Sequence, residues 1–260
     1  MGMLKANYHT HTWRCNHAEP NERAYVEAAL EVGMDTLGFA DHSPYVFEGA
    51  YYSGYRMKRE LTDGYIEVVS ALREEFRGRI DVHIGFEAEY YPKYFKQYLE
   101  YLEPKPYEYL LLGQHFGGNE IGMPPAGTPS EDVGALEAYY DQCMEALNTG
   151  AFSCWVHPDL YRFVGDEAVY RRVVRKACRE AKGLGIPIEI NLLGLGDRRH
   201  YPRETFWEEA AAVGNDIIIG WDAHSPGWMK QPELEARGFD IVSRLGLHRI
   251  DYLTLVRPHI

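Results

Sequence analysis

Seven histidines follow directly or closely on short apolar segments expected to be β-strands, and two carboxylates occupy equivalent places. The histidines are His9, His11, His17, His42, His115, His157 and His224, and the carboxylates are Glu87 and Asp222. A chain that repeatedly places such a group between a strand and a helix gathers these groups at one rim of the fold. Protonated imidazoles gathered there would repel one another unless a cation were bound. The pattern therefore predicts a metal-dependent enzyme that holds more than one metal ion.

The spacing within this set favours shared ligation. His9 and His11 are separated by one residue, so in a strand both imidazoles face the same side and can reach one metal. Asp222 and His224 repeat this spacing near the end of the chain. Glu87 and Glu89 make a third such pair, and a carboxylate there could bridge two ions.

Residues beside these candidate ligands are expected to have other roles. Asp41 directly precedes His42, so their side chains diverge, and Asp41 is expected to orient a ligand rather than to bind metal. Glu89 is expected to act in the same way. Cys15 lies among the histidines and is a candidate ligand, but the expectation for all four cysteines is a small buried side chain. The remaining histidines are expected to be structural or on the surface, and these are His83, His200, His248 and His259.

Short apolar segments alternate with longer amphipathic ones along the whole chain. The expected strands are residues 4–8, 36–40, 81–86, 109–113, 152–156, 187–191 and 216–220, and the expected helices are residues 22–31, 60–76, 94–102, 132–148, 167–182, 203–212 and 233–245. Because each helix returns the chain to the same end, the strands should be parallel. Nearly every unit supplies a candidate ligand, which a closed α/β barrel explains better than an open sheet with one switch point. Residues 252–256 are a candidate eighth strand, and the irregular residues 117–129 are expected to form a lid or a substrate wall.

Composition limits the class of protein and its partners. The chain has 260 residues, of which 45% are hydrophobic and 25% charged, and no internal boundary is evident, so residues 1–260 are expected to form one domain. The net charge of −12 argues against a nucleic-acid partner. Four cysteines without a CxxC pair, and no apolar run of membrane-spanning length, predict a cytoplasmic protein without a membrane anchor. Nothing in the sequence indicates an oligomeric state.

These motifs resemble the PHP superfamily, named for polymerase and histidinol phosphatase, from residue 8 to about residue 226. They appear in the family's order, as HxH with a third histidine (His9, His11, His17), DH (Asp41, His42), GxE (Glu87), QHF (His115), HPD (His157) and DAH (Asp222, His224). The resemblance implies a distorted (β/α)7 barrel with the metal site at the carboxyl ends of the strands. It also implies three divalent metal ions, and imidazole-rich ligation suits Zn, Mn or Fe better than Mg.

The resemblance also implies which side chains share each ion. The first ion would be bound by His9, His11, Glu87 and Asp222, the second by Glu87, His115 and His157, and the third by His17, His42 and His224. In this arrangement Glu87 bridges two ions.

Within the superfamily the chain is most similar to the monofunctional L-histidinol-phosphate phosphatases. The narrower likeness rests on residues 51–57 (YYSGYRM), residues 189–191 (EIN) and the segment from Gly194 to Pro202. It implies a phosphatase of histidine biosynthesis that hydrolyses a small phosphate monoester, L-histidinol phosphate, with metal-activated hydroxide. The residues that would act on the substrate are Glu87, Asp222 and an arginine, for which Arg162, Arg198 and Arg199 are the candidates, with Asn191 as a further substrate contact. A planar guanidinium suits phosphate because it can bind two oxygens at once.

Three alternatives remain at this point. A PHP nuclease or nucleotide phosphoesterase would use the same ligands, but a polynucleotide needs a basic groove with stacking aromatic side chains. An amidohydrolase also begins with HxH and ends with an aspartate on a strand, although Glu87 and the additional His17 favour the PHP pattern. A metal-binding module without catalytic activity would be expected to lack ligands, and all nine are present.

Overall fold

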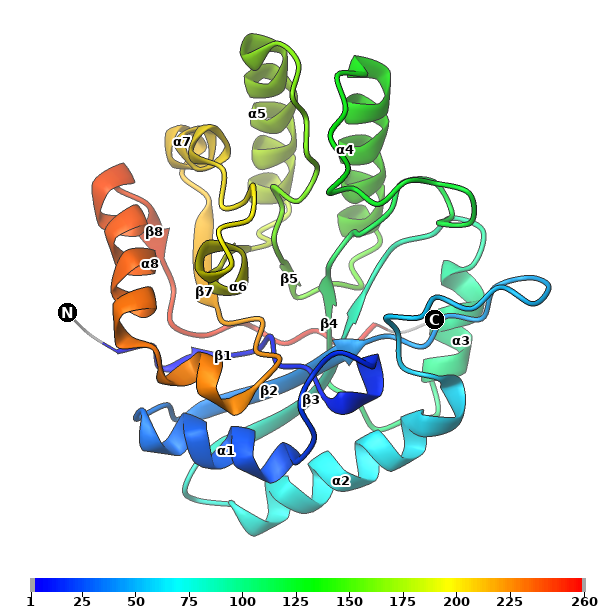
Figure 1. The fold of residues 1–260 in the computed structure, drawn as a ribbon, viewed down its shortest axis with the longest axis vertical. Helices are drawn as coiled ribbons and strands as arrows, with labels where there is room; N and C mark the ends of the chain where they lie inside the picture. The colour runs from blue at the N-terminus through cyan, green and yellow to red at the C-terminus, as the bar shows by residue number, and fades with distance from the viewer. Residues whose placement is uncertain (1–2, 259–260) are drawn as a thin grey trace.

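The computed structural model describes residues 3–258 of the chain. Within this range, eight parallel strands in chain order form one curved sheet, and the helices pack around its outer side (Figure 1). The strands are β1 (Ala6–Asn7), β2 (Thr36–His42), β3 (Asp81–Ala88), β4 (Tyr109–Leu112), β5 (Cys154–Trp155), β6 (Ile188–Asn191), β7 (Asp216–Gly220) and β8 (His248–Arg249). The α-helices are α1 (Glu22–Glu31), α2 (Thr62–Glu75), α3 (Phe95–Leu102), α4 (Val133–Asn148), α5 (Glu167–Gly183), α6 (Leu192–Gly196), α7 (Glu204–Val213) and α8 (Pro232–Leu245). Three 3₁₀ helices complete the set, namely η1 (Trp13–Cys15), η2 (Arg59–Leu61) and η3 (Pro226–Lys230).

Each of the seven expected strands and seven expected helices is present, with ends shifted by a few residues. The eighth strand is β8, which pairs with β7. The prediction of an eighth strand at residues 252–256 was therefore wrong, because the chain there makes no strand pairing. The short helix α6, which directly follows β6, was not expected.

The sheet closes on itself at the carboxyl ends of its strands. Thr10, just after β1, forms a parallel bridge with Ala223, just after β7. His11 N–H donates to the Ala223 carbonyl at 2.9 Å, and Ala223 N–H donates to the His9 carbonyl at 3.0 Å. Seven strands therefore meet in a ring at this end, while β8 extends the sheet beside the amino end of β7. The fold is a distorted (β/α)7 barrel, as expected.

The interior of the barrel is packed with buried apolar side chains, among them Tyr109 of β4. Its hydroxyl donates to the Tyr8 carbonyl at 2.7 Å, across the ring. Glycines on the neighbouring strands make room for it, because a Cβ at Gly38 would lie 2.2 Å from the tyrosine oxygen and one at Gly85 would lie 2.5 Å from the ring. Because this side chain occupies the barrel interior, the space for a ligand lies beyond it, at the carboxyl ends of the strands.

The outer helices are amphipathic, and α5 illustrates how the sequence forms them. Asp166 caps its amino end, accepting from the backbone N–H groups of Ala168 and Val169. Its buried side chains include Tyr170, Val173 and Val174, which recur at helical spacing and pack on the core. No helix within residues 3–258 combines the length and apolar character needed to cross a bilayer.

Candidate metal centre

The nine predicted ligands converge at the carboxyl end of the barrel. A cavity of about 500 Å³ opens there, and six of them line it, namely His17, His42, His115, His157, Asp222 and His224. The other three, His9, His11 and Glu87, lie at its base and are at most 1% exposed. The structure thus brings all nine side chains into one site.

Glu87, near the end of β3, lies at the middle of this set. Five imidazole nitrogens lie within 3.5 Å of its carboxylate, those of His9, His11, His42, His115 and His157. The shortest of these distances are 2.7 Å from Oε1 to His157 Nε2 and 2.9 Å from Oε2 to His42 Nδ1. Gly113, after β4, leaves the space for this carboxylate, because a Cβ there would lie 1.9 Å from Oε1. One carboxylate can therefore serve two ions on its two oxygens.

Asp222 forms a second centre of contacts, after β7. Its Oδ1 lies 3.0 Å from His11 Nε2, 3.5 Å from His9 Nε2 and 3.4 Å from His224 Nδ1. The imidazole of His224 also faces His17, with 3.0 Å between their Nε2 atoms. Asp222 and His157 both have positive φ angles, of 49° and 32°. Such strained backbone in residues other than glycine is concentrated at functional sites.

The donor atoms fit bound cations. Buried polar atoms that lack a hydrogen-bond partner among the described residues gather here, and they include His9 Nε2, His11 Nε2, His42 Nδ1, Glu87 Oε2 and Asp222 Oδ1. Buried atoms of this kind are normally satisfied, because leaving one without a partner costs about 1–3 kcal/mol. Triads with donor atoms within 4.8 Å of one another include His9, His11 and Asp222, as well as His9, Glu87 and His157. Mixed imidazole and carboxylate donors at this spacing suit divalent transition metals.

The buried groups of the site have strongly shifted pKa values. Burial opposes ionisation of Glu87, but His42, His115 and the other surrounding imidazoles hold its pKa well below the usual range. Burial lowers the pKa of His224 to about 3, and nearby His11 contributes. This lowered pKa favours the neutral imidazole, the form that has a lone pair for a metal. His9 and His11 differ, because burial is outweighed by neighbouring carboxylates such as Asp222, which hold the pKa of each well above its usual range.

Carboxylates behind three of the histidines orient them. Glu89 Oε1 lies 2.9 Å from His115 Nδ1, and Asp41 Oδ1 lies 3.4 Å from His11 Nδ1, in the places expected of orienting partners. Glu189 of β6 was not predicted, although its Oε2 lies 2.9 Å from His9 Nδ1.

One signal in the sequence could have indicated the role of Glu189. It lies two residues before Asn191 on a strand, so both side chains are on the same face of the sheet. The space that Glu189 occupies depends on a neighbouring strand, because a Cβ at Gly220 would lie 2.0 Å from its Oε2.

Of the three predicted arginines, only Arg199 lines the cavity. Its Nη1 donates to the Tyr201 hydroxyl at 3.0 Å, and its Nη2 donates to Asp197 Oδ2 at 2.9 Å. Arg162 and Arg198 are exposed and are not part of the cavity wall.

Asn191 lies below the cavity rather than in its lining. Its Nδ2 contacts Glu189 Oε1 at 2.9 Å and Asp222 Oδ2 at 3.1 Å, while its Oδ1 accepts from Gly194 N–H at 2.8 Å. Through these contacts Asn191 positions Asp222 and caps α6, and its contact with substrate stays a prediction.

The rest of the cavity wall comes partly from segments singled out in the sequence, namely residues 51–57 and the segment from Gly194 to Pro202. Tyr55 contributes from the loop after β2, and the remaining lining side chains are Leu160, Leu193, Asp197, Tyr201 and Trp228. None of residues 117–129 lines the cavity, so that segment does not form its wall in this structure.

The remaining histidines and Cys15 lie outside the set of predicted ligands. His83, His200 and His248 contact Glu108, the Leu160 carbonyl and Asp216. His259 lies outside the described residues. Cys15 is buried, donates its thiol to the Thr12 carbonyl at 3.1 Å, and lies within 4.8 Å of donor atoms of His17 and His224.

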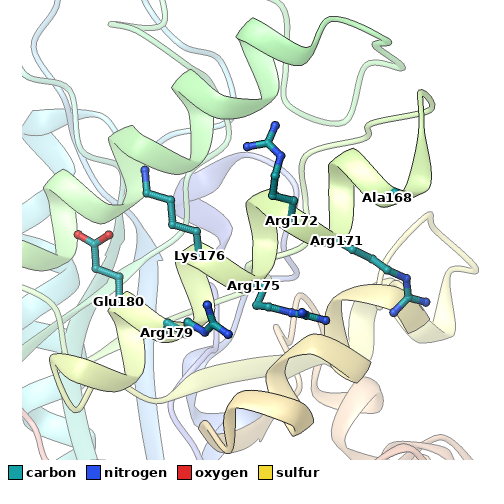
Figure 2. A pocket seen from close by; sticks show the side chains of 7 residues that line it. All are labelled: Ala168, Arg171, Arg172, Arg175, Lys176, Arg179 and Glu180. Carbon is teal, nitrogen blue, oxygen red and sulfur yellow. The ribbon is translucent and has the colours of Figure 1, made fainter.

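A second hollow, of about 760 Å³, follows the outer face of α5 and is rich in cations (Figure 2). Figure 2 shows Arg172 and Lys176 pointing toward α4, where they pair with Glu137 and Asp141. Arg171 and Arg175 pair with Glu208 and Glu209 of α7. These ion pairs join neighbouring helices and share no residue with the histidine cluster.

Comparisons with known proteins agree with the geometry. The model of the PHP domain family matches residues 7–192. A protein of Deinococcus radiodurans described as a probable histidinol-phosphatase is 32% identical over 228 residues, which cover 84% of this chain and 86% of that protein. The histidinol-phosphatase of Bacillus subtilis is 28% identical over 120 residues, or 44% of this chain and 45% of that protein.

A solved structure has the same fold. The crystal structure of histidinol phosphate phosphatase from Lactococcus lactis, complexed with zinc, L-histidinol and phosphate, superimposes with a TM-score of 0.74 and 18% identity. The match covers 96% of each chain.

Proposed function

The chain belongs to the PHP domain family, and from this membership we propose that it is a metal-dependent phosphatase that converts L-histidinol phosphate and water to L-histidinol and phosphate. The observation that carries the proposal is the convergence of nine ligand side chains on one cavity, with unsatisfied donor atoms facing one another. The similar proteins of Deinococcus radiodurans and Bacillus subtilis are named as histidinol-phosphatases, which supports this substrate. Histidine biosynthesis is the corresponding pathway.

We further propose that three divalent ions share these ligands. The first would be held by His9, His11, Glu87 and Asp222, the second by Glu87, His115 and His157, and the third by His17, His42 and His224. The contacts of Glu87 and Asp222 support the first two sets, and the 3.0 Å approach of His17 and His224 supports the third. Zinc is favoured because the Lactococcus lactis structure is complexed with it, and Mn and Fe fit the same donors. When bound, divalent ions supply Lewis acidity toward phosphoryl oxygens and lower the pKa of water.

The chain's own residues bind and orient the substrate. Arg199 has five N–H donors. Asp197 accepts from Nε and Nη2, and Tyr201 accepts from Nη1, which leaves two donors without a partner among the described residues. We propose that these two bind phosphoryl oxygens, with Asp197 and Tyr201 fixing the guanidinium plane.

The apolar side of the cavity is suited to the organic end of the substrate. Leu160, Leu193 and Trp228 form a wall that excludes water and can pack against an imidazole ring. Binding energy from this remote end can be used to orient the phosphoryl group, so its loss should lower kcat/KM.

A substrate panel tests this proposal. L-Histidinol phosphate, an aryl phosphate, a nucleoside monophosphate and single-stranded DNA would be assayed with Zn, Mn or Fe added. We expect kcat/KM for L-histidinol phosphate to exceed that for the aryl phosphate by at least about 100-fold. Equal values for all three small phosphates would reject the substrate and leave a phosphoesterase of broad specificity.

A nucleic-acid substrate has less support. Arg199 is the single arginine or lysine among the described residues that line the cavity, and two aspartates line it as well. A polynucleotide would require a basic groove that continues from the site.

A further inference from the structure

A fully buried arginine lies behind the metal centre. Arg56, in the loop between β2 and α2, is 1% exposed, and its two carboxylate partners, Glu89 and Glu120, are 0% and 1% exposed. Its Nη1 donates to Glu89 Oε2, and its Nη2 donates to Glu120 Oε2 at 2.6 Å. A charge so deeply buried is costly unless it is paired, so the guanidinium has to keep a carboxylate partner in the folded protein.

Aromatic side chains hold this arginine in one position. Its guanidinium lies 4.6–5.9 Å from four ring centroids, those of Tyr45, Phe47, Tyr55 and Tyr91. The hydroxyl of Tyr55 donates to Glu89 Oε1 at 2.9 Å, and that of Tyr91 donates to Glu120 Oε2 at 2.7 Å. The arginine and both carboxylates therefore form a rigid unit.

Within this unit, the atom that contacts a candidate ligand is Oε1 of Glu89. Glu89 Oε1 lies 2.9 Å from His115 Nδ1, and the opposite nitrogen of that ring, Nε2, lies 3.5 Å from Glu87 Oε1. The other two orienting carboxylates differ, because Glu189 is bound by Asn191 and Asp41 by Thr12. Among the described residues, Glu89 alone of the three is bound by an arginine.

We infer that Arg56 is a positioning residue of the metal centre, which fixes the imidazole of His115 by holding Glu89. The inference rests on the proposed function in that His115 is taken as a ligand of the second ion. The planar guanidinium of Arg56 holds Glu89 on one nitrogen and Glu120 on the other. Glu120 anchors the far end of that fork. It follows His115 by five residues, at a positive φ of 67°, in the segment that leads away from the ligand.

Two variants isolate the contact between Arg56 and Glu89. Glu120→Gln keeps an acceptor for Arg56 and leaves Glu89 untouched, so it serves as the control. The double variant R56Q/E120Q has the same net charge as the native cluster but no cation on Glu89. Zn²⁺ affinity would be measured by competition with a chromophoric chelator, and the Co²⁺-substituted proteins would be compared by their d–d absorption. Thermal unfolding would establish that each variant is folded.

We expect Glu120→Gln to bind Zn²⁺ within about twofold of the unmodified chain. R56Q/E120Q should bind one ion at least about tenfold more weakly, with an altered Co²⁺ spectrum, because loss of an orienting partner typically costs 10–100-fold in metal affinity. Glu89→Gln, which leaves Arg56 paired with Glu120, should weaken the same ion and decides the question if the double variant does not fold.

Unchanged or tighter Zn²⁺ binding in R56Q/E120Q, or in Glu89→Gln, would overturn the inference. Failure of the unmodified chain to bind at least two Zn²⁺ would instead overturn the proposed metal centre, so the two failures are distinguishable.

Discussion

Glu87 contacts more of the candidate ligands than any other side chain, and its position explains why the site requires a carboxylate there. Five imidazole nitrogens surround it within 3.5 Å, so its charge can offset two cations while its two oxygens serve both. Residues around the nine candidate ligands act by holding other side chains of the site through hydrogen bonds. Asn191 holds Asp222 from below, and Asp197 and Tyr201 hold Arg199.

Replacement of Glu87 by glutamine should remove activity and metal together. The amide keeps the shape of the side chain but loses the negative charge, so kcat/KM should fall by at least about 100-fold and the metal content should drop. Activity assays and elemental analysis would measure this, with Glu67→Gln on the exposed face of α2 as the control. Near-normal activity in Glu87→Gln would show that another carboxylate bridges the ions.

The convergence of the nine candidate ligands could be predicted because their types and their places after strands are local features of the sequence. Glu189 and Arg56 could not, because their roles depend on neighbours that are distant in the chain. Glu189 fits only where Gly220 of the next strand leaves space, and Arg56 is buried only because aromatic side chains from separate segments enclose it. The sequence alone does not distinguish a buried arginine of this kind from an arginine on the surface.

At the scale of elements, the strands were predictable from their short apolar runs, and the helices from their amphipathic repeat. The two-residue strand β8 was not predicted, because it is defined by its pairing with β7 rather than by an apolar run of its own. Glycines on the strands illustrate how an element positions a functional group. Gly113 at the end of β4 and Gly220 at the end of β7 each leave room for a carboxylate of the preceding strand.

Substitution of Gly113 by alanine should therefore damage the site without unfolding the barrel. A Cβ there would lie 1.9 Å from Glu87 Oε1, so the carboxylate must move and both metal content and kcat should fall. Gly64→Ala is the matched control, because its Cβ meets nothing within 4 Å in α2 and should stabilise that helix by about 0.5–1 kcal/mol. Circular dichroism and metal analysis of both variants would test this, and full metal content in Gly113→Ala would contradict it.

At the scale of the whole molecule, the metal site also closes the fold. The bridge between Thr10 and Ala223 lies between ligands on both of its strands, since His9 and His11 flank the first residue and Asp222 and His224 flank the second. Bound ions at this seam would tie the first strand to the seventh. The residues that close the barrel are more than 200 positions apart in the chain. The alternation of strands and helices therefore predicted a barrel, but not which residues close it.

Removal of metal should consequently lower the thermal stability of the whole chain. A ligand at 100 times its Kd stabilises the folded state by about 2.7 kcal/mol. Chelation should therefore lower Tm by about 5 °C or more, and added Zn²⁺ should restore it. Differential scanning calorimetry would measure both, and Glu87→Gln should show a much smaller shift. An unchanged Tm after complete chelation would show that the ions do not stabilise the barrel.

The metal stoichiometry of the active protein tests the central claim most directly. After reconstitution with Zn²⁺ and removal of loosely bound ions, elemental analysis should find between about two and three equivalents per chain, because nine ligands are too many for one ion. Activity on L-histidinol phosphate should rise in step with that content. A protein that reaches full activity with one equivalent or fewer would contradict the account.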